Sequence, residues 1–243
     1  MNRRGRFGQR GDNGGRLIPE WMDEAGADPD QLKRSLRFIR RVNFLLGYAR
    51  ATLAHLHRFS ASWKTGQTIR IVDVGTGSAD IPLAILRWAQ RRRFDVRIVA
   101  VERHEQTASI AALRATGPNL KIVQGDALKM PLDDGAFDYA LSAMFLHHLE
   151  GPGAVELLAR MDRLATRGLI VSDLLRSRRA LWWIRFFTLL SNPMVRHDAA
   201  LSVLQAFDQK EAQGLAKRAG LKYLRYYRHF GHRFVLAGEK KAY

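Results

Sequence analysis

The stretch TIRIVDVGTGSAD, residues 68–80, passes from an apolar run into a glycine turn and then into the start of a helix. Residues 69–74 are rich in branched apolar side chains and predict a short buried strand. Gly75 and Gly77 let the backbone turn sharply and approach a ligand closely, and Pro82 is tolerated in the first turn of the helix that Asp80 opens. A strand, a glycine turn and a helix in this order predict the nucleotide-binding turn of an open α/β sheet.

The same alternation continues along the chain. Apolar runs predict strands at 96–102, 120–123, 137–142 and 168–173, with helices over 106–115 and 154–165 between them. Strands that alternate with helices predict a mostly parallel sheet with helices on both faces. Near the end, a helix over 208–219 precedes two strands, 222–229 and 233–237, which only a short turn at Gly231 separates. The sheet is therefore expected to end in an antiparallel strand.

The residues before this sheet divide into two parts. Residues 1–16 are rich in Gly, Arg and Asn and predict a disordered basic tail. From an expected N-cap at Asp30, apolar residues recur every three or four positions up to Leu56, which predicts an amphipathic helix with a break near Gly47. We expect residues 17–66 to form an N-terminal helical cap and residues 67–243 to form the main domain. Within the main domain, residues 176–207 are expected to form a lid over the substrate.

The composition excludes several kinds of chemistry. The chain of 243 residues has no cysteine, which excludes disulfides, thiolate metal sites and cysteine nucleophiles. No metal-ligand spacing stands out either, so no metal site is expected. No apolar run approaches the length of a membrane span, and a cytoplasmic location is expected. The net charge of +17 attracts polyanions, although it also fits a basic composition spread along the chain.

Acidic residues follow three successive strands at the edge where open α/β sheets bind ligands: Asp73, Glu102 and Asp126. A dinucleotide site would place a third glycine at position 80 and a pyrophosphate near the helix start, where Asp73 would repel it. S-adenosylmethionine (SAM) has no phosphate and carries a sulfonium and an ammonium, which an acidic residue attracts. Glu102 can accept hydrogen bonds from ribose hydroxyls and Asp126 from the adenine amino group. The charges therefore favour SAM over NAD.

The segments 71–80, 126–127 and 137–139, together with Glu102, resemble the successive motifs of class I SAM-dependent methyltransferases. The resemblance implies a Rossmann-like seven-stranded sheet and a SAM site built from Asp73, Gly75, Thr76, Gly77, Asp80, Glu102, Arg103, Asp126, Ala127 and Ser142. Ala79 departs from the family, many members of which have a glycine there. Within the class the chain is similar to bacterial small-molecule methyltransferases of quinone, phenolic-lipid and type III polyketide pathways.

Two histidine sites are candidates for the general base that deprotonates the methyl acceptor. A hydroxyl nucleophile benefits from a general base whose pKa lies near the working pH, and histidine suits this role. His148, preceded by His147, follows the fourth predicted strand and is the first candidate. His197, followed by Asp198, lies in the expected lid and is the second. The alternative interpretations are that His148 caps a helix and that His197 lies in a surface loop.

The segment 180–190 combines two tryptophans, two phenylalanines and several leucines with Arg185. It predicts either a core or dimer-interface helix, or a lipophilic lid that contacts an anionic membrane surface. The chain is expected to be a monomer or a homodimer.

We expect O-methylation of a hydrophobic phenol, quinol or polyketide-derived aromatic, with ring C-methylation as the nearest variant. An RNA or protein methyltransferase is the main alternative, which the basic tail favours. The fourth strand instead runs into residues 142–145, SAMF, without the Asn/Asp-Pro-Pro-aromatic motif of many enzymes that methylate planar nitrogens, and no RNA-binding module is appended. Nucleic acid is therefore not expected as a partner. A non-catalytic SAM-binding subunit is a further alternative.

Overall fold

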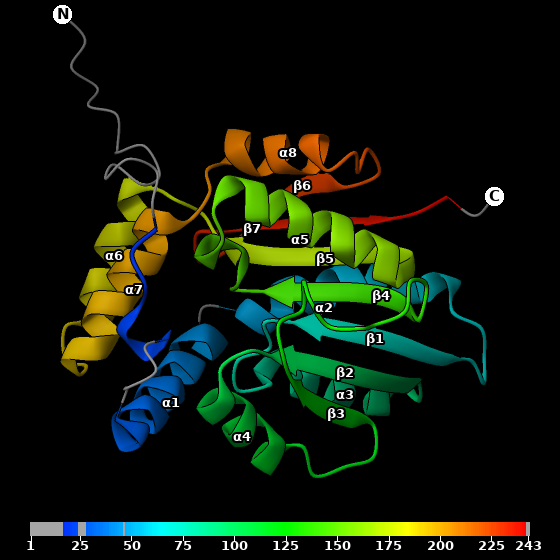
Figure 1. Ribbon diagram of the computed structural model, residues 1–243, viewed down its shortest axis with the longest axis horizontal. Helices are drawn as coiled ribbons and strands as arrows, with labels where there is room; N and C mark the ends of the chain where they lie inside the picture. The colour runs from blue at the N-terminus through cyan, green and yellow to red at the C-terminus, as the bar shows by residue number, and fades with distance from the viewer. Residues whose placement is uncertain (1–16, 24–27, 46, 242–243) are drawn as a thin grey trace, which may run out of the picture.

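The computed structural model describes residues 17–23, 28–45 and 47–241 and contains one seven-stranded sheet (Figure 1). The strands lie in the order β3-β2-β1-β4-β5-β7-β6, and β7 runs antiparallel to both of its neighbours. The predicted Rossmann-like fold with an antiparallel terminal strand is therefore confirmed. The strands are β1 (Thr68–Val74), β2 (Asp95–Glu102), β3 (Leu120–Gln124), β4 (Phe137–Ala143), β5 (Ala165–Leu174), β6 (Arg225–His229) and β7 (Arg233–Glu239).

Helices cover both faces of the sheet and the end at which the parallel strands finish. The helices are α1 (Pro29–Leu45), α2 (Tyr48–Phe59), α3 (Asp80–Arg92), α4 (Glu105–Arg114), α5 (Gly151–Leu164), α6 (Arg178–Thr188), α7 (Pro193–Gln205) and α8 (Gln209–Arg218). Three short 3-10 helices accompany them: η1 (Trp21–Asp23), η2 (Ser60–Ser62) and η3 (Leu146–His148). Helices α1, α6 and α7 lie together beyond the carboxyl ends of the strands (Figure 1).

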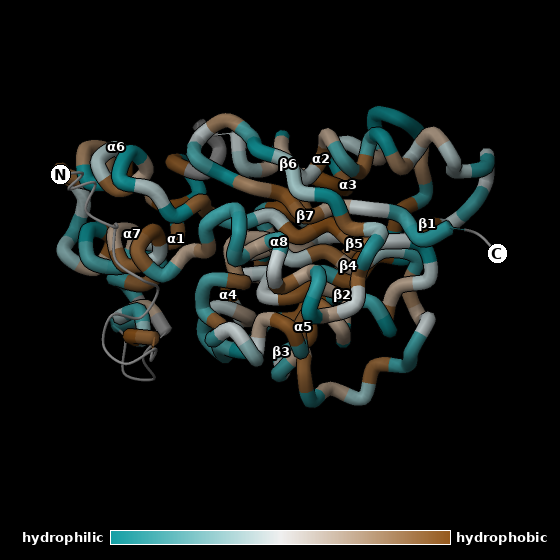
Figure 2. Tube along the Cα trace, turned by 90° about the horizontal axis from the view of Figure 1, so that it is seen from above, coloured by the Kyte–Doolittle hydropathy of each residue, from teal (hydrophilic) through white to brown (hydrophobic). Residues whose placement is uncertain are grey.

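Two apolar cores lie on the two faces of the sheet. The trace of the central strands is accordingly coloured as hydrophobic in Figure 2. One core packs α5 and α8 against the sheet, with Leu157, Leu158 and Leu215 fully buried. The other packs α2, α3 and α4, with Leu56 and Ile85 fully buried. Because the central strands are covered on both sides, they are apolar along most of their length. Their apolar runs therefore predicted them from the sequence.

The N-terminal helices follow the predicted pattern with one correction. The expected break near Gly47 is confirmed, because Gly47 has a φ of +72° and α2 begins at the next residue. The expected cap at Asp30 is wrong: Asp28 accepts the backbone N–H groups of Asp30 and Gln31, at 3.2 and 3.3 Å. Pro29 occupies the first helical position, where its missing N–H costs nothing, so the helix begins earlier than expected. The predicted tail, residues 1–16, lies outside the described residues.

The expected lid consists of α6 and α7. Ser177 caps α6 by accepting the N–H of Ala180 at 3.1 Å, and Asn192 caps α7 by accepting the N–H of Val195 at 2.9 Å. Among the described residues, no helix has both the length and the apolar character needed to span a bilayer.

Candidate active site

A cavity of about 630 Å³ lies at the carboxyl ends of β1 to β4, a volume typical of small-molecule sites. The turns after these strands form its floor, and α1 and α2 close it from the other side. Nine of the ten residues predicted to bind SAM line it: Asp73, Gly75, Thr76, Gly77, Asp80, Glu102, Arg103, Asp126 and Ala127. The N-terminal part contributes Met22, Leu32, Leu36, Ile39 and Tyr48. The sheet edge and the N-terminal helices therefore build one binding site together.

The glycine turn holds its shape through backbone contacts. The N–H of Gly75 donates to the carbonyl of Val101 at 3.0 Å, and Gly75 has a φ of +69°. A Cβ atom at this position would lie 2.4 Å from the ring of Phe145. Gly77 also has a positive φ, of +57°, but open space surrounds it. Gly75 is therefore required both by its backbone conformation and by the aromatic ring packed against it.

Asp73 brings a buried acid to this turn. Its side chain is almost fully buried, and within the described part of the chain its Oδ1 atom has no hydrogen-bond partner. Burial raises its pKa to about 7; the Thr76 hydroxyl opposes this, and the nearby Glu102 carboxylate adds to it. A cation in the cavity would satisfy the carboxylate and favour its ionised form. Asp73 thus fits the cationic methionine part of SAM.

Two further acids line the same cavity at the ends of the next strands. Glu102 accepts the N–H of Gly77 at 2.8 Å and that of His104 at 2.9 Å, one with each oxygen. Asp126 accepts the N–H of Leu128 at 3.0 Å. Carboxylate oxygens accept more than one hydrogen bond, so both residues can still receive ribose hydroxyls or an adenine amino group. The backbone contacts hold them in place for this role.

Asp80 and Ser142 have structural partners. Asp80 forms an ion pair with Arg114 at 2.7 Å and accepts the Ser78 hydroxyl at 3.0 Å, which holds it in the cavity wall. Ser142 departs from the expectation. Its buried hydroxyl donates to the carbonyl of Val74 at 3.0 Å and does not line the cavity. Ser142 therefore links β4 to β1 beneath the site.

A second cavity of about 440 Å³ lies between α1, α6, α7 and the turn that joins β6 to β7. Its walls are mostly apolar, with Phe38, Val42, Leu174, Trp183, Ile184, Phe187, Val195 and Val203 among them. Ile39 and Met144 line both cavities. Met144 has a φ of +57°, an uncommon conformation for a residue other than glycine. The two cavities thus meet at these two side chains.

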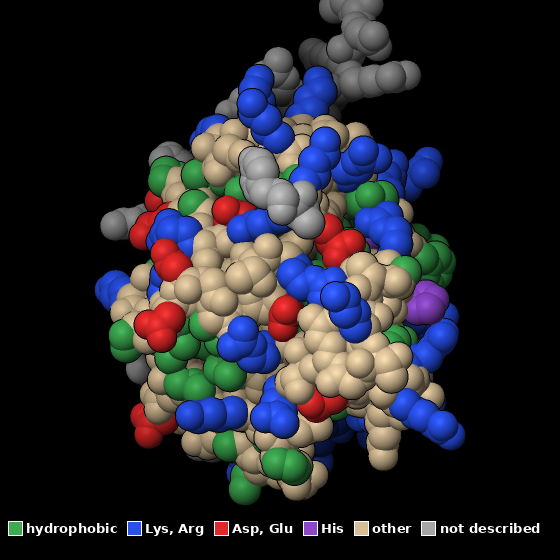
Figure 3. All heavy atoms as spheres, turned by 90° about the vertical axis from the view of Figure 1, so that its right-hand side faces the viewer, with side chains coloured by type: hydrophobic (Ala, Val, Ile, Leu, Met, Phe, Trp, Pro, Cys, Tyr) green, Lys and Arg blue, Asp and Glu red, His purple; other side chains and the backbone are tan. Residues whose placement is uncertain are grey.

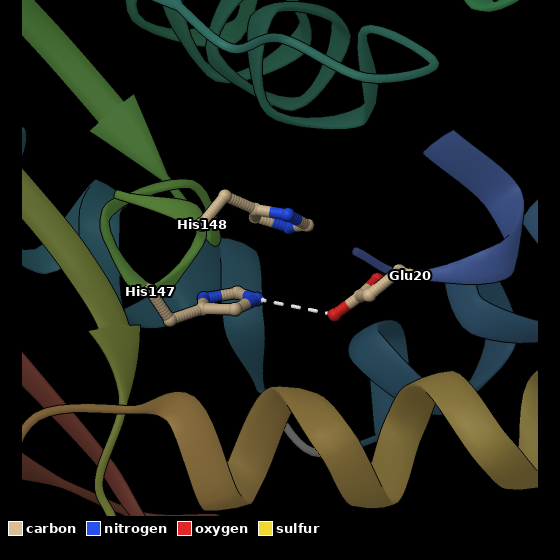
Figure 4. A group of neighbouring side chains, drawn as sticks. All are labelled: Glu20, His147 and His148. Carbon is tan, nitrogen blue, oxygen red and sulfur yellow. Dashed lines mark ion pairs between the residues drawn. The ribbon is translucent and has the colours of Figure 1, made fainter. Parts of the chain in front are cut away.

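Glu20, His147 and His148 form a cluster (Figure 4), which lies where the two cavities approach each other. His148 lines the first cavity, and Glu20, from the N-terminal segment, lines the second. His147 is buried between them. Its Nδ1 lies 2.7 Å from Oδ1 of Asp173, and its Nε2 lies 3.8 Å from Oε1 of Glu20. The contact with Asp173 fixes the orientation of the His147 ring.

The same cluster has the composition of a metal-ligand set, although no metal site is predicted from the sequence. One ligand atom each of Glu20, His147 and His148 lie within 4.8 Å of one another. Two imidazoles and a carboxylate suit several divalent metals, and a carboxylate such as Asp173 often orients a metal-binding histidine. Sequence spacing cannot reveal this group, because Glu20 is distant from the histidines along the chain.

The second predicted site, His197 with Asp198, lies on α7 and outside this cluster. His197, on α7, stacks on the ring of Trp21 at 4.2 Å, and its Nδ1 lies 2.8 Å from Oδ1 of Asp198. Asp198 also accepts the N–H groups of Trp21 and Met22, at 2.9 and 3.0 Å. His197 lines neither cavity, whereas Asp198 borders the second. The structure therefore places this pair where it holds the N-terminal segment against α7.

Sequence reasoning missed Glu20, Met144 and Arg233 as residues of the site. Arg233 is buried beneath the ring of Tyr48, 4.7 Å from its centroid, and its Nη1 lies 3.1 Å from the sulfur of Met144. Burial lowers the pKa of Arg233, and the charge of the Asp173 carboxylate opposes this. No sequence pattern marks an arginine that opens a terminal strand. Asp173, in contrast, ends a predicted strand and falls at the ligand-binding edge.

Residues 71–168 match the family described as a methyltransferase domain. No curated protein sequence matches the chain. Among solved structures, a SAM-dependent methyltransferase from Aquifex aeolicus has a TM-score of 0.59 at 18% identity, over 87% of this chain and 98% of that one.

Two other similar structures differ in the atom that their names say they methylate. The CurJ carbon methyltransferase has a TM-score of 0.63 at 13% identity, over 87% of this chain and 61% of that one. A family 2 O-methyltransferase from Planctomyces limnophilus, in complex with apigenin, has a TM-score of 0.54 at 20% identity, over 90% of this chain and 66% of that one. The chain thus spans less than two thirds of the length of these two structures. At such low identities the likeness shows the fold, and the family match adds that residues 71–168 are similar to a methyltransferase domain.

Proposed function

We propose that this protein transfers the methyl group of SAM to a hydroxyl oxygen of a hydrophobic phenol, quinol or polyketide-derived aromatic. The observation that carries the proposal is the apolar second cavity, which meets the SAM cavity at Ile39 and Met144. SAM, when bound, supplies an electrophilic methyl group on a cationic sulfur. A neighbouring apolar cavity suits an acceptor that is held close to that methyl group.

His148 is the proposed general base. It lines the SAM cavity, and one of its ring nitrogens lies within 4.8 Å of a carboxylate oxygen of Glu20, which lines the second cavity. In-line transfer needs the acceptor oxygen aligned with the methyl group, and deprotonation makes that oxygen more nucleophilic. His147, held by Asp173, packs against His148 with 4.4 Å between ring centroids and helps to position it.

Ring C-methylation of a quinol uses the same two cavities. The ring carbon would then take the methyl group, and a base would remove the proton of the ring carbon or of the hydroxyl. The solved structures similar to this fold include an O-methyltransferase and a carbon methyltransferase, so fold similarity does not separate the two reactions.

The test offers labelled SAM to three separate pools: lipophilic phenols and quinols, total RNA, and a protein extract. We expect label in the phenol pool, and proton and carbon spectra of the product distinguish a methoxy group from a ring methyl group. His148→Ala should lose at least about a hundredfold in kcat with SAM affinity retained, as expected for removal of a general base. Added imidazole should restore part of the rate.

His197→Ala is the matched control, because His197 lines neither cavity and Asp198 keeps its hydrogen bonds to the N–H groups of Trp21 and Met22. We expect its kcat to stay close to that of the wild type. Label in RNA or protein alone would overturn the small-molecule acceptor. SAM binding without transfer to any pool would indicate a non-catalytic SAM-binding subunit.

A further inference from the structure

Helix α6 carries an exposed aromatic surface. Trp182 and Phe186 are 61% and 58% exposed, and Trp183 and Phe187 are exposed beside them. The chain after the helix exposes Leu189 and Leu190. We call Trp182, Trp183, Phe186, Phe187, Leu189 and Leu190 the aromatic face. It contains six of the eleven large hydrophobic side chains that are exposed on the described residues, so the apolar surface is concentrated in one place.

The position of the aromatic face agrees with contact to a large apolar partner. Helix α6 lies at the outer end of the molecule in both ribbon and tube views (Figures 1 and 2). A contiguous apolar patch of this kind on a soluble protein usually marks a protein or membrane contact. The helix, with 11 residues, is far too short to cross a bilayer, but it can lie in the plane of a membrane surface.

Basic side chains surround the aromatic face. Arg178, Arg179 and Arg185 are exposed on α6, and no acidic residue occurs between Leu174 and His197. Arg179 also lies near the turn between β6 and β7: burial lowers the pKa of His232 there, and the charges of Arg228 and Arg179 lower it further. At the opposite end of the molecule, lysines and arginines are interspersed with acidic side chains (Figure 3). The segment that carries α6 therefore differs from that end by its lack of acidic residues.

The second cavity opens beside this surface. Trp183 and Phe187 of the aromatic face also line the cavity. Phe230, which lies in the turn between β6 and β7, lines it as well and is 82% exposed. A molecule dissolved in the outer part of a bilayer would meet the mouth of the cavity without crossing water.

We propose that the aromatic face docks on an anionic lipid bilayer, with its aromatic side chains among the acyl chains and its arginines at the headgroups. The arginine stems can lie along the apolar surface while their guanidinium groups reach the phosphates. As an extension that rests on the proposed function, the second cavity receives its lipophilic acceptor from that bilayer.

A second copy of this chain fits the surface less well. Two copies that meet through the same patch place the same side chains opposite each other, so arginines would face arginines. No acid between Leu174 and His197 could offset this repulsion. An anionic bilayer instead supplies both an apolar interior and negative charge.

The test measures co-sedimentation of the full chain with phosphatidylcholine vesicles, with and without phosphatidylglycerol, in the absence of any acceptor. We expect binding to the anionic vesicles that weakens with salt. The variant Trp182→Ser/Phe186→Ser should lose most of the binding, and Arg185→Gln should lose about fivefold. Neither change touches a residue that lines either cavity, so turnover of a water-soluble phenol should stay unchanged.

Leu113→Ser and Arg92→Gln are the matched controls, since they remove an exposed leucine and an exposed arginine from α4 and α3. We expect both to bind vesicles as the wild type does. Equal binding of the Trp182→Ser/Phe186→Ser variant and the wild type would overturn the proposal, as would a dimer in light scattering that this variant dissociates. Vesicle binding is measured without an acceptor, so a failure to bind vesicles is distinguishable from a failure of the proposed methyl transfer.

Discussion

The ring of Phe145 occupies the space that a side chain at residue 75 would need, 2.4 Å from an ideal Cβ atom on Gly75. The turn after β1 and the chain after β4 are thereby packed together at the floor of the SAM cavity. The positive φ of Gly75 adds a second reason for glycine. This contact joins the segments that follow two neighbouring strands, β1 and β4.

Gly75→Ala should therefore weaken SAM binding strongly, by at least about tenfold, because the turn must shift and Phe145 must move into the cavity. Titration calorimetry with SAM measures the loss. Gly66→Ala is the matched control, since Gly66 has a φ of +76° with open space around it and lies away from the cavity. It should lower the free energy of unfolding by about 1 kcal/mol and leave SAM affinity unchanged. In the double variant Gly75→Ala/Phe145→Ala, part of the affinity should return; no recovery would show that Phe145 is not the cause.

The affinity for SAM should depend on pH through Asp73. Burial raises its pKa to about 7 in the ligand-free protein, so below this pH the carboxyl is mostly neutral and must lose a proton when the cationic ligand binds. The Kd for SAM should fall as pH rises towards 7, by up to about tenfold per pH unit, and level off above it. Calorimetry in buffers of different ionisation enthalpy measures the released proton.

Asp73→Asn is the control for this dependence and should bind SAM weakly at every pH. The same shift has a consequence for stability. An acid whose pKa is raised by folding destabilises the folded state as pH rises from about 4, its unfolded value, to about 7. The ligand-free Asp73→Asn variant should therefore unfold at a higher temperature than the wild type at pH 7. A pH-independent Kd in the wild type would contradict the role given to Asp73.

The sequence predicted the sheet and most of the SAM cavity because both depend on local patterns. Buried parallel strands are apolar along their length, and the turns after them carry glycines and acids at a common edge. The residues around the expected acceptor position do not follow a local sequence pattern. Glu20, Met144 and Arg233 come from the N-terminal segment, the end of β4 and the start of β7, and they meet only through tertiary packing. Ser142 shows the reverse case, since its position fits a ligand contact and its hydroxyl instead bonds to Val74.

Removal of metal ions separates two uses of the cluster of Glu20, His147 and His148. If His148 acts as the base, methyl transfer should persist after dialysis against a strong chelator, and this is the outcome we expect. The measurement is the rate with labelled SAM before and after dialysis, together with the metal content of the protein. A rate that is lost and then restored by zinc or manganese would instead assign a bound ion to these ligands. Glu20→Gln should then prevent the restoration, because it removes the charged ligand.

The second cavity can be filled without changing the first. Ala199 lines the second cavity from α7 and does not line the SAM cavity. Ala199→Trp should fill much of the space and raise the acceptor KM by at least about tenfold, with the Kd for SAM unchanged, because a hydrophobic acceptor loses its contact area. Ala200→Trp is the matched control, since the neighbouring residue on the same helix lines neither cavity. Equal KM values for the two variants would place the acceptor outside the second cavity, and a loss of SAM affinity in Ala199→Trp alone would show that the two cavities do not bind independently.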